Sequence, residues 1–323
     1  MILAGDIGGT NTRLAFLEPR EGRLKLVAEQ TFPSREHPNL LVVLRKFLAS
    51  NPLPVERACL GVAGPVRNGR CDATNLPWVV DASEVAEELG IETAGLINDL
   101  EANAHGIPTL EAKDFVALNP GASAAEGNAA IISAGTGLGE AVLYWDGTRH
   151  KPFATEGGHA DFAPRTDLEI ELLRYLLHQY PRVSYERLVS GPGLFNIYRF
   201  LRDTGHAEEA PWLAERMRRQ EPPPVIGQAA LEGSSPLCVQ ALDLFVSIYG
   251  AEAGNLALKV MAFGGIFIGG GIAPKILPKL REPTFLNAFT TKGRLSYLVQ
   301  SIPVRVIMND KTALFGAARF ATF

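Results

Sequence analysis

Apolar residues along the chain form two kinds of run, short continuous stretches closed by glycine and longer stretches with helical spacing. Residues 2–16 are apolar on both sides of Gly8-Gly9-Thr10-Asn11, which predicts the two strands of a hairpin. A third strand is expected near residues 24–32. Apolar side chains three or four residues apart then predict a helix over residues 39–48.

Short strands and helices alternate in the next part of the chain. Residues 57–63 and 94–98 are apolar and predict strands, while residues 81–89 predict a helix that Gly90 ends. A further helix is expected from Glu101. The order β-β-β-α-β-α-β-α indicates a mixed sheet with helices on it, not the strict alternation of a dinucleotide-binding domain.

The second half begins near Ile107-Pro108 and repeats the opening pattern. Residues 129–145 are two apolar runs around the glycine-rich turn Ser133–Gly139, after a loop of small residues at 121–128. The remaining predicted elements are helices at 167–177, 193–203, 236–263 and 311–321, strands at 265–268 and 303–308, and a third glycine turn at 269–271. The stretch Glu221-Pro222-Pro223-Pro224 predicts a stiff connector, and residues 205–224 are interpreted as a charged, variable insertion.

Composition narrows the class of protein. A chain of 323 residues suggests two domains. Its 31 basic and 35 acidic residues give a net charge of −4, which argues against a nucleic-acid partner. Three scattered cysteines predict no disulfide and a cytoplasmic location. The stretch Val260–Pro274 is too short and too rich in glycine to span a membrane, and the N-terminus lacks the basic region of a targeting segment.

Three glycine turns follow predicted strands, at residues 8–9, 135–137 and 269–271. Such turns expose backbone N–H groups that can hold phosphate oxygens. Neither the GxxxxGK[ST] nor the GxGxxG phosphate-binding motif is present. Asp6 precedes the first turn, and a carboxylate beside phosphates suits a hydrated Mg²⁺ ion. A tight turn with no ligand explains any single case, but three such turns favour nucleotide binding.

These turns carry a resemblance to a known superfamily. Asp6–Arg13 resembles the first phosphate loop of the actin-like ATPases, Ala134–Gly137 their second, and Gly269–Gly271 their adenosine-contacting turn. The resemblance is closest to the bacterial ATP-dependent glucokinase family. It rests on four further strings in family order: Thr74-Asn75-Leu76-Pro77-Trp78, Ile97-Asn98-Asp99-Leu100, Glu156-Gly157-Gly158-His159, and Tyr185-Glu186-Arg187 followed by Ser190-Gly191-Pro192-Gly193.

The resemblance implies an α/β, two-domain actin-like ATPase fold, similar to ribonuclease H, with the active site in the interdomain cleft. The expected small domain is residues 1–107 plus 301–323, and the large domain is residues 108–300. The implied reaction transfers a phosphoryl group from ATP, with Mg²⁺, to the 6-hydroxyl of D-glucose. Closure of the domains over glucose is expected, because excluding water suppresses hydrolysis of ATP. The family also implies a homodimer.

The residues alone leave two roles open for Asp99, helix N-cap or general base, and the resemblance favours the general base. It implies a set of sugar ligands: Asn75, Asn98, Asp99, Glu156, His159 and Glu186. It implies a set of nucleotide contacts: Gly5, Asp6, Ile7, Gly8, Gly9, Thr10, Asn11, Arg13, Gly135, Thr136, Gly137, Gly270 and Gly271. Asp6 is expected to bind Mg²⁺ through water.

Several alternatives stay open or are disfavoured. No cysteine lies between Cys71 and Cys238, so the zinc cluster of the related repressor/ORF/kinase group is not expected. A non-catalytic sugar sensor is disfavoured, because a phosphate loop that begins at Gly5 leaves no room for a helix-turn-helix. Another hexose or a polyphosphate donor stays possible. Glu140 departs from the family pattern, and we expect it either to face solvent or to perturb nucleotide binding.

Overall fold

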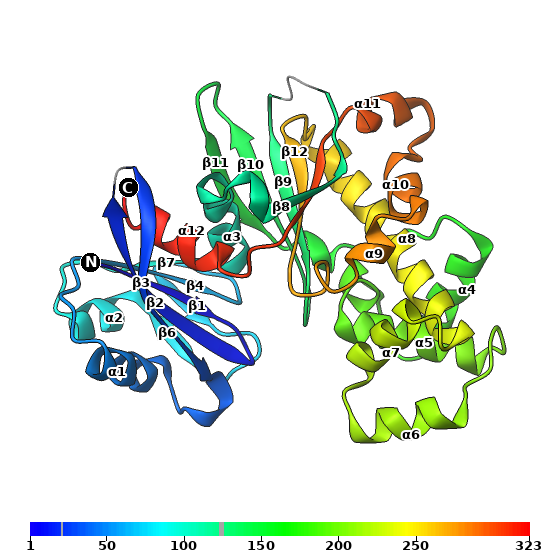
Figure 1. Ribbon diagram of the computed structural model, residues 1–323, viewed down its shortest axis with the longest axis horizontal. Coiled ribbons are helices and arrows are strands. Elements are labelled where there is room, and N and C mark those ends of the chain that lie inside the picture. The colour runs from blue at the N-terminus through cyan, green and yellow to red at the C-terminus, as the bar shows by residue number, and fades with distance from the viewer. Residues whose placement is uncertain (21, 123–125) are drawn as a thin grey trace. The chain divides into compact units, whose positions relative to one another are not determined.

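The computed structural model describes residues 1–20, 22–122 and 126–323, which divide into two compact units (Figure 1). Unit 1 consists of Met1–Asp114, Pro152–Ala154 and Asn309–Phe323. Unit 2 consists of Phe115–Lys151 and Thr155–Met308. The sequence-based domain boundaries were placed at residues 107 and 301. Part of the loop expected at 121–128 lies outside the described residues.

Unit 1 is built on a five-stranded sheet in the order β3-β2-β1-β4-β7. Its strands are β1 (Ile2–Ile7), β2 (Asn11–Arg20), β3 (Arg23–Pro33), β4 (Arg57–Val62) and β7 (Gly95–Asn98). The first three strands form the antiparallel meander that the sequence predicts. β4 then pairs with β1 and β7 pairs with β4, both in parallel. A two-stranded ladder of β5 (Arg70–Asp72) and β6 (Val79–Asp81) was not predicted.

The helices of unit 1 begin and end at recognisable capping residues. α1 (Leu40–Ser50) begins after Asn39, whose side chain accepts the Val42 N–H. α2 (Ala82–Leu89) ends at Gly90, which has a φ of 64°, a left-handed conformation that favours glycine. α3 (Asp99–Gly106) follows β7 directly. The 3-10 helices here are η1 (Ser34–Glu36), η2 (Ile107–Thr109) and η3 (Ala112–Asp114).

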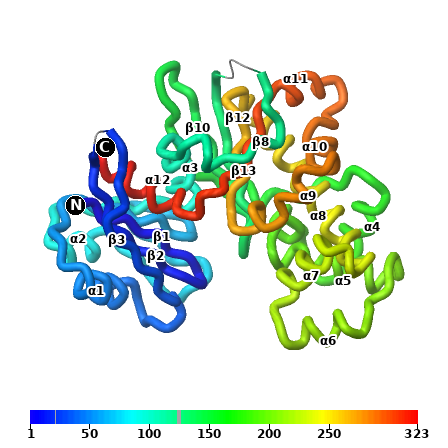
Figure 2. The backbone as a smooth tube through the Cα atoms, in the orientation of Figure 1, coloured from blue at the N-terminus to red at the C-terminus, as the bar shows by residue number. Residues whose placement is uncertain are grey.

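The C-terminal helix α12 (Thr312–Phe320) packs against α3 and the sheet of unit 1 (Figure 2). Two glycines allow the helices to approach closely. A Cβ on Gly316 would collide with the Ala102 carbonyl, and a Cβ on Gly106 would collide with the Thr312 carbonyl. Ala313, Leu314 and Ala317 are buried in the same cluster as β1 and β2 residues. The C-terminal segment is therefore part of the core that supports α3.

Unit 2 contains a six-stranded sheet in the order β11-β10-β9-β12-β13-β8. The strands of this sheet are β8 (Phe115–Asn119), β9 (Ala129–Ala134), β10 (Leu138–Trp145), β11 (His150–Thr155, of which Pro152–Ala154 are grouped with unit 1), β12 (Gly265–Gly269) and β13 (Val304–Ile307). β9 and β12 are parallel, with Gly269 opposite Ser133. The second and third glycine turns therefore leave the sheet at the same edge.

Helices pack around this sheet, and residues of both form the largest buried hydrophobic cluster among the residues that the structure describes. They are α4 (Asp167–Leu177), α5 (Gly191–Asp203), α6 (Pro211–Arg219), α7 (Pro222–Leu231), α8 (Pro236–Val260), α9 (Leu277–Leu280), α10 (Pro283–Thr290) and α11 (Ser296–Gln300). The 3-10 helices are η4 (Gly157–His159), η5 (Tyr185–Arg187) and η6 (Gly293–Leu295).

α8 is long and apolar enough to cross a membrane by length and composition, but 72% of its most apolar window is buried inside the structure. It is therefore the central core helix of unit 2.

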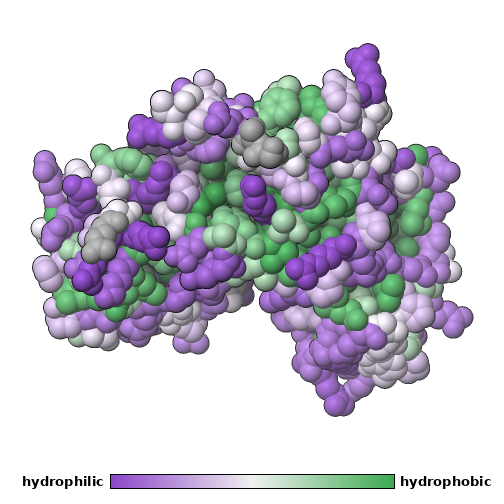
Figure 3. Space-filling model, turned by 45° about the horizontal axis from the view of Figure 1, so that its top comes forward, coloured by the Kyte–Doolittle hydropathy of each residue, from purple (hydrophilic) through white to green (hydrophobic). Residues whose placement is uncertain are grey.

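Hydrophilic residues cover much of the face shown in Figure 3.

The prediction of a stiff connector at Pro222-Pro223-Pro224 was wrong, because these residues form the first turn of α7. Proline is tolerated there, since the first N–H groups of a helix have no intrahelical acceptor. The charged stretch before them contains α6, which was not predicted. The long helix predicted to end at Phe263 ends at Val260, where Met261 adopts a left-handed conformation.

Candidate active site

The parallel strands of unit 1 bring the predicted residues of that unit to one edge of the sheet. Ile7 of β1 lies opposite Val62 of β4, and Val62 lies opposite Asn98 of β7. Side chains that follow these three strands therefore share the carboxyl edge, where open α/β sheets bind ligands. The first glycine turn follows β1, and Asp99 follows β7.

Hydrogen bonds from Ser34 brace the first glycine turn. The Gly8 N–H donates to the Asn11 carbonyl at 3.0 Å, which closes the turn. The Ser34 hydroxyl donates to the Gly8 carbonyl at 2.8 Å and lies 2.9 Å from the Thr12 hydroxyl oxygen. The Ser34 N–H donates to the Thr10 carbonyl at 2.9 Å. Sequence reasoning missed Ser34, because a single serine after a strand carries no signal of such a role.

The predicted nucleotide contacts in this turn differ in what they can offer. Gly5 and Ile7 are buried, and a Cβ on Gly5 would lie 2.5 Å from a Leu60 methyl carbon. These two residues can reach a ligand only through their backbone. Thr10 and Asn11 are exposed. Arg13 donates to the Asp310 carboxylate at 3.0 Å and to the Asp310 carbonyl at 2.9 Å.

Asp6 lies at the end of β1 in a partly buried position. Burial raises the pKa of its carboxyl group, and the Arg13 guanidinium lowers that pKa by a smaller amount. Within the described ranges, no cluster of three or more His, Cys, Asp or Glu side chains could hold a metal ion. A single carboxylate still fits Mg²⁺, because this ion keeps several waters and needs few protein ligands.

Asn75 lies against the first glycine turn. A Cβ on Gly9 would lie 2.6 Å from the Asn75 Cβ atom, so the two backbones approach closely. The preceding Thr74 donates its N–H to the Ala63 carbonyl at 3.1 Å. That bond ties the Asn75 segment to the turn that follows β4. Asn75 itself is exposed.

Asn98, rather than Asp99, is the N-cap of α3. Its side-chain oxygen accepts the N–H groups of Leu100 at 2.9 Å and Glu101 at 3.3 Å. Its amide nitrogen donates to the Gly64 carbonyl at 3.1 Å. Asp99 is the first residue of the helix and is partly exposed. Its carboxylate accepts the Leu100 N–H at 2.9 Å.

In unit 2 the second and third glycine turns are in contact. The Gly135 N–H donates to the Gly137 carbonyl at 2.9 Å, which closes the second turn. Gly270 has a φ of 81°, and a Cβ there would collide with the Ala134 carbonyl. The Ile272 N–H donates to that same carbonyl at 3.3 Å. Two of the predicted nucleotide-binding segments are therefore brought together.

Glu186 of η5 is bound to the second glycine turn. Its carboxylate accepts the Leu138 N–H at 3.0 Å. A Cβ on Gly137 would lie 2.5 Å from the same carboxylate oxygen, so only glycine allows this approach. The Ser190 hydroxyl donates to the Glu186 carbonyl at 2.7 Å and accepts the Gly193 N–H at the start of α5. The string around Glu186 is thus one connected structure.

Glu156 precedes η4 and His159 is its last residue, and both side chains are exposed. The two glycines between them pack onto β10: a Cβ on Gly158 would collide with the Leu138 carbonyl. The His159 N–H donates to the Glu156 carbonyl at 3.0 Å, and Arg182 donates to the His159 carbonyl. We refer to residues 156–159, which include two predicted sugar ligands, as the sugar loop.

Glu140 does not face solvent. It is only 2% exposed. Its carboxyl group lies under the sugar loop, where it would collide with a Cβ on Gly157. Burial, with a smaller effect of Glu252, raises the pKa of this carboxyl to about 7, and Lys259 lowers it. The expectation that Glu140 faces solvent was therefore wrong.

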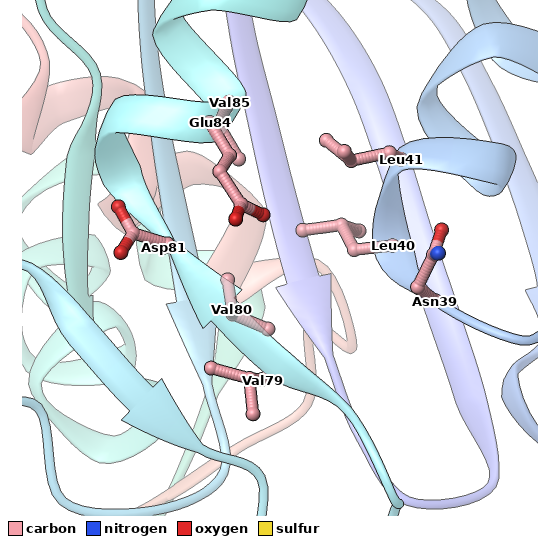
Figure 4. Close-up of a pocket in the computed structure, with 8 residues that line it drawn as sticks. All are labelled: Asn39, Leu40, Leu41, Val79, Val80, Asp81, Glu84 and Val85. Carbon is pink, nitrogen blue, oxygen red and sulfur yellow. The ribbon is translucent and has the colours of Figure 1, made fainter.

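A separate cavity of about 160 Å³ lies in unit 1 among α1, β6 and α2 (Figure 4). Leu40 and Val80 line it with apolar atoms, and Asp81 and Glu84 contribute carboxylates. None of its lining residues is a predicted site residue.

Comparisons with known proteins agree on one family. The model of the glucokinase family matches residues 3–322. A glucokinase from a Nostoc species is 45% identical, with 98% of each chain covered. A glucokinase crystal structure from an Antarctic psychrotroph superposes with a TM-score of 0.85 at 33% identity, covering 99% of this chain and 98% of the other. These similarities confirm the predicted fold class.

A more distant structural similarity supports the assignment of the fold and nothing further. A glucokinase of the repressor/ORF/kinase group from Streptomyces griseus, solved with glucose and AMPPNP, has a TM-score of 0.69 at 20% identity. It covers 99% of this chain and 99% of its own.

Proposed function

This chain belongs to the glucokinase family and phosphorylates glucose, and we propose that Asp99 is its general base and ATP its phosphoryl donor. The observation that carries the proposal is the position of Asp99. It is the first residue of α3, at the sheet edge where the first glycine turn also leaves the sheet. Asn98 caps the helix, so the Asp99 carboxylate is not required for that purpose.

The proposed base removes the proton from the 6-hydroxyl of glucose as its oxygen attacks the γ-phosphorus of ATP. Phosphoryl transfer needs mainly positioning and charge stabilisation, so the base must lie close to the hydroxyl. The Leu100 N–H holds one Asp99 carboxylate oxygen. The N-terminus of α3 favours a negative charge on Asp99, which is the form a base requires.

Sugar binding is assigned to the predicted polar side chains. Asn75, Asn98 and Asp99 belong to unit 1, and Glu156, His159 and Glu186 belong to unit 2. A polyol needs many paired donors and acceptors, because each buried polar group left unpaired costs about 1–3 kcal/mol. The contact of the Glu186 carboxylate with the Leu138 N–H and the packing of Gly158 on the Leu138 carbonyl support this assignment, since they fix the backbone that carries these side chains.

ATP binding is assigned to the three glycine turns. Backbone N–H groups of the first two glycine turns, other than those of Gly8 and Gly135 that close the turns, would hold the phosphates, and Gly270 and Gly271 would contact the adenosine. Asp6 would hold Mg²⁺ through water, and the ion would offset the negative charge of the phosphates. The AMPPNP bound by the Streptomyces griseus relative is consistent with a nucleotide donor.

We also propose that the enzyme is a cytoplasmic homodimer that acts in glycolysis. The buried thiols of Cys59, Cys71 and Cys238 suit a reducing compartment. Glucose 6-phosphate, the product, is a substrate for glycolytic enzymes. Light scattering of the purified protein would give about twice the 34.8 kDa chain mass for a dimer, whereas the mass of one chain would contradict it.

The donor and the acceptor can be tested together. Purified protein is assayed with a panel of hexoses and with ATP, ADP or polyphosphate, and sugar phosphate is measured in a coupled assay. We expect turnover with ATP and glucose. Turnover with polyphosphate alone would contradict the proposed donor, and a faster rate with another hexose would revise the acceptor.

A further inference from the structure

The Glu140 carboxyl group lies directly beneath the sugar loop. Glu140 belongs to β10 and is opposite Ile132 of β9. Its side chain fills the space that Gly157 leaves by having no Cβ. In the part of the chain that the structure describes, its Oε1 atom is buried with no hydrogen-bond partner. A buried carboxyl oxygen without a hydrogen-bond partner carries a desolvation cost, and that cost is largest when the group is ionised.

The backbone of Glu140 is also linked to the loop. The Thr155 hydroxyl donates to the Glu140 carbonyl at 3.0 Å and accepts the Gly157 N–H at 3.2 Å. Thr155 thus connects β10 to the first residue of η4. The sugar loop is held at Gly157 by two contacts, this hydroxyl bridge and the Glu140 carboxyl group.

The ionisable groups that face Glu140 come from α8. They are Glu252, Lys259 and Tyr249. Glu252 is fully buried and binds Lys259 at 3.1 Å, so its charge is already paired. β9 presents Ile132 and β11 presents Thr155, neither of which titrates. Burial and the nearby Glu252 both disfavour the ionised form of Glu140.

We propose that Glu140 is a positioning residue that keeps the sugar loop in its binding conformation only while its carboxyl group is neutral. An ionised carboxylate here requires water, and water can enter only if Gly157 moves away from β10. Movement of Gly157 displaces Glu156 and His159 on either side of it. The proposal rests on the proposed roles of these two residues as sugar ligands.

The test compares the pH dependence of glucose KM in the wild type and Glu140→Gln, an isosteric side chain that cannot ionise. For the wild type we expect KM to rise above pH 7, at most about tenfold per pH unit for one proton. In Glu140→Gln we expect KM to stay low over the same range, with ATP KM unchanged. Parallel profiles for the two proteins would overturn the proposal.

Two further variants keep the test decisive. Glu140→Met has a similar length and cannot ionise, so it should reproduce the flat profile if Glu140→Gln folds poorly. Glu215→Gln, on the exposed surface of α6, should keep the wild-type profile. A wild-type profile in Glu140→Met would overturn the proposal.

His159→Ala separates this proposal from the assignment of the sugar loop. We expect it to raise glucose KM at every pH. If it does so while Glu140→Gln behaves as the wild type, only the role of Glu140 fails. If His159→Ala leaves KM unchanged, the sugar-loop assignment fails and the role of Glu140 falls with it.

Discussion

Asn98 serves both the fold and the proposed site with one side chain. Its amide oxygen can accept two hydrogen bonds, and both are used by N–H groups of α3. One of its two amide N–H bonds is used by the Gly64 carbonyl. Among the hydrogen bonds of the described residues, the second amide N–H is left for a sugar hydroxyl. The same bonds that would orient this donor also begin the helix that carries Asp99.

Replacing Asn98 with alanine should therefore reduce stability and weaken glucose binding together. Loss of the cap costs about 1 kcal/mol, and the Gly64 carbonyl loses its donor. Thermal unfolding and glucose KM would be measured on the same preparation. Asn39→Ala, which removes the cap of α1, should lower stability by a similar amount without changing KM. An unchanged KM in Asn98→Ala would argue against its role as a ligand.

Residue types were predictable from the sequence, but their partners were not. The strings around Asn98 and Glu186 indicated polar ligands through their resemblance to the glucokinase family. Nothing in the sequence indicated that Asn98 rather than Asp99 caps α3, since both residues are favoured at that position. The position of Glu140 under Gly157 depends on how β10 meets η4, and eleven residues of chain separate these two elements.

At the scale of elements, glycines let the loops of unit 2 pack directly on one another. Gly137 admits the Glu186 carboxylate, and Gly158 admits the Leu138 carbonyl. A side chain at either position would push one loop away from the other. The second glycine turn and the sugar loop are therefore mechanically connected through β10.

Gly158→Ala should raise glucose KM, because the new Cβ would displace the sugar loop from the Leu138 carbonyl. Gly227→Ala is the matched control, since a Cβ there meets nothing within 4 Å and the residue lies within α7. That change should leave KM unchanged and stabilise the helix by about 0.5–1 kcal/mol. Equal KM values for both variants would contradict the proposed connection.

Element prediction succeeded where periodicity was strong and failed where one residue type misled. The meander of unit 1 follows from apolar runs around a Gly-Gly turn. The first turn of α7 was not predicted, because three successive prolines are more typical of a connector than of a helix start. The β5–β6 ladder has only three residues in each strand, too few for an alternating pattern to be detected.

At the scale of the whole molecule, unit 1 is completed by the end of the chain. α12 packs against α3 and against the sheet through buried alanines and Leu314. α3 begins with Asp99, so the C-terminal helix packs against the helix that carries the proposed base. Length alone suggested two units, and the family resemblance suggested that the C-terminus returns to the first. Close packing at Gly316 has no signature in a single sequence.

Removing residues 309–323 should abolish the cooperative unfolding of unit 1 and with it glucose phosphorylation, because a large apolar surface of α3 and β1 would be exposed. Thermal unfolding and limited proteolysis would measure this, with cleavage expected within residues 1–114. A chain lacking only Thr322 and Phe323, which are exposed, should behave much as the full chain does. An active, cooperatively folded 1–308 chain would contradict this account.

The central claim, that Asp99 is the general base, is tested most directly by the turnover and glucose affinity of Asp99→Asn. Asparagine has nearly the same shape and can still accept the Leu100 N–H, but it cannot remove a proton. We predict that kcat falls at least about 10²-fold, while the Kd for glucose, measured by calorimetry, stays within a few-fold of the wild type. A kcat comparable to that of the wild type would contradict the claim.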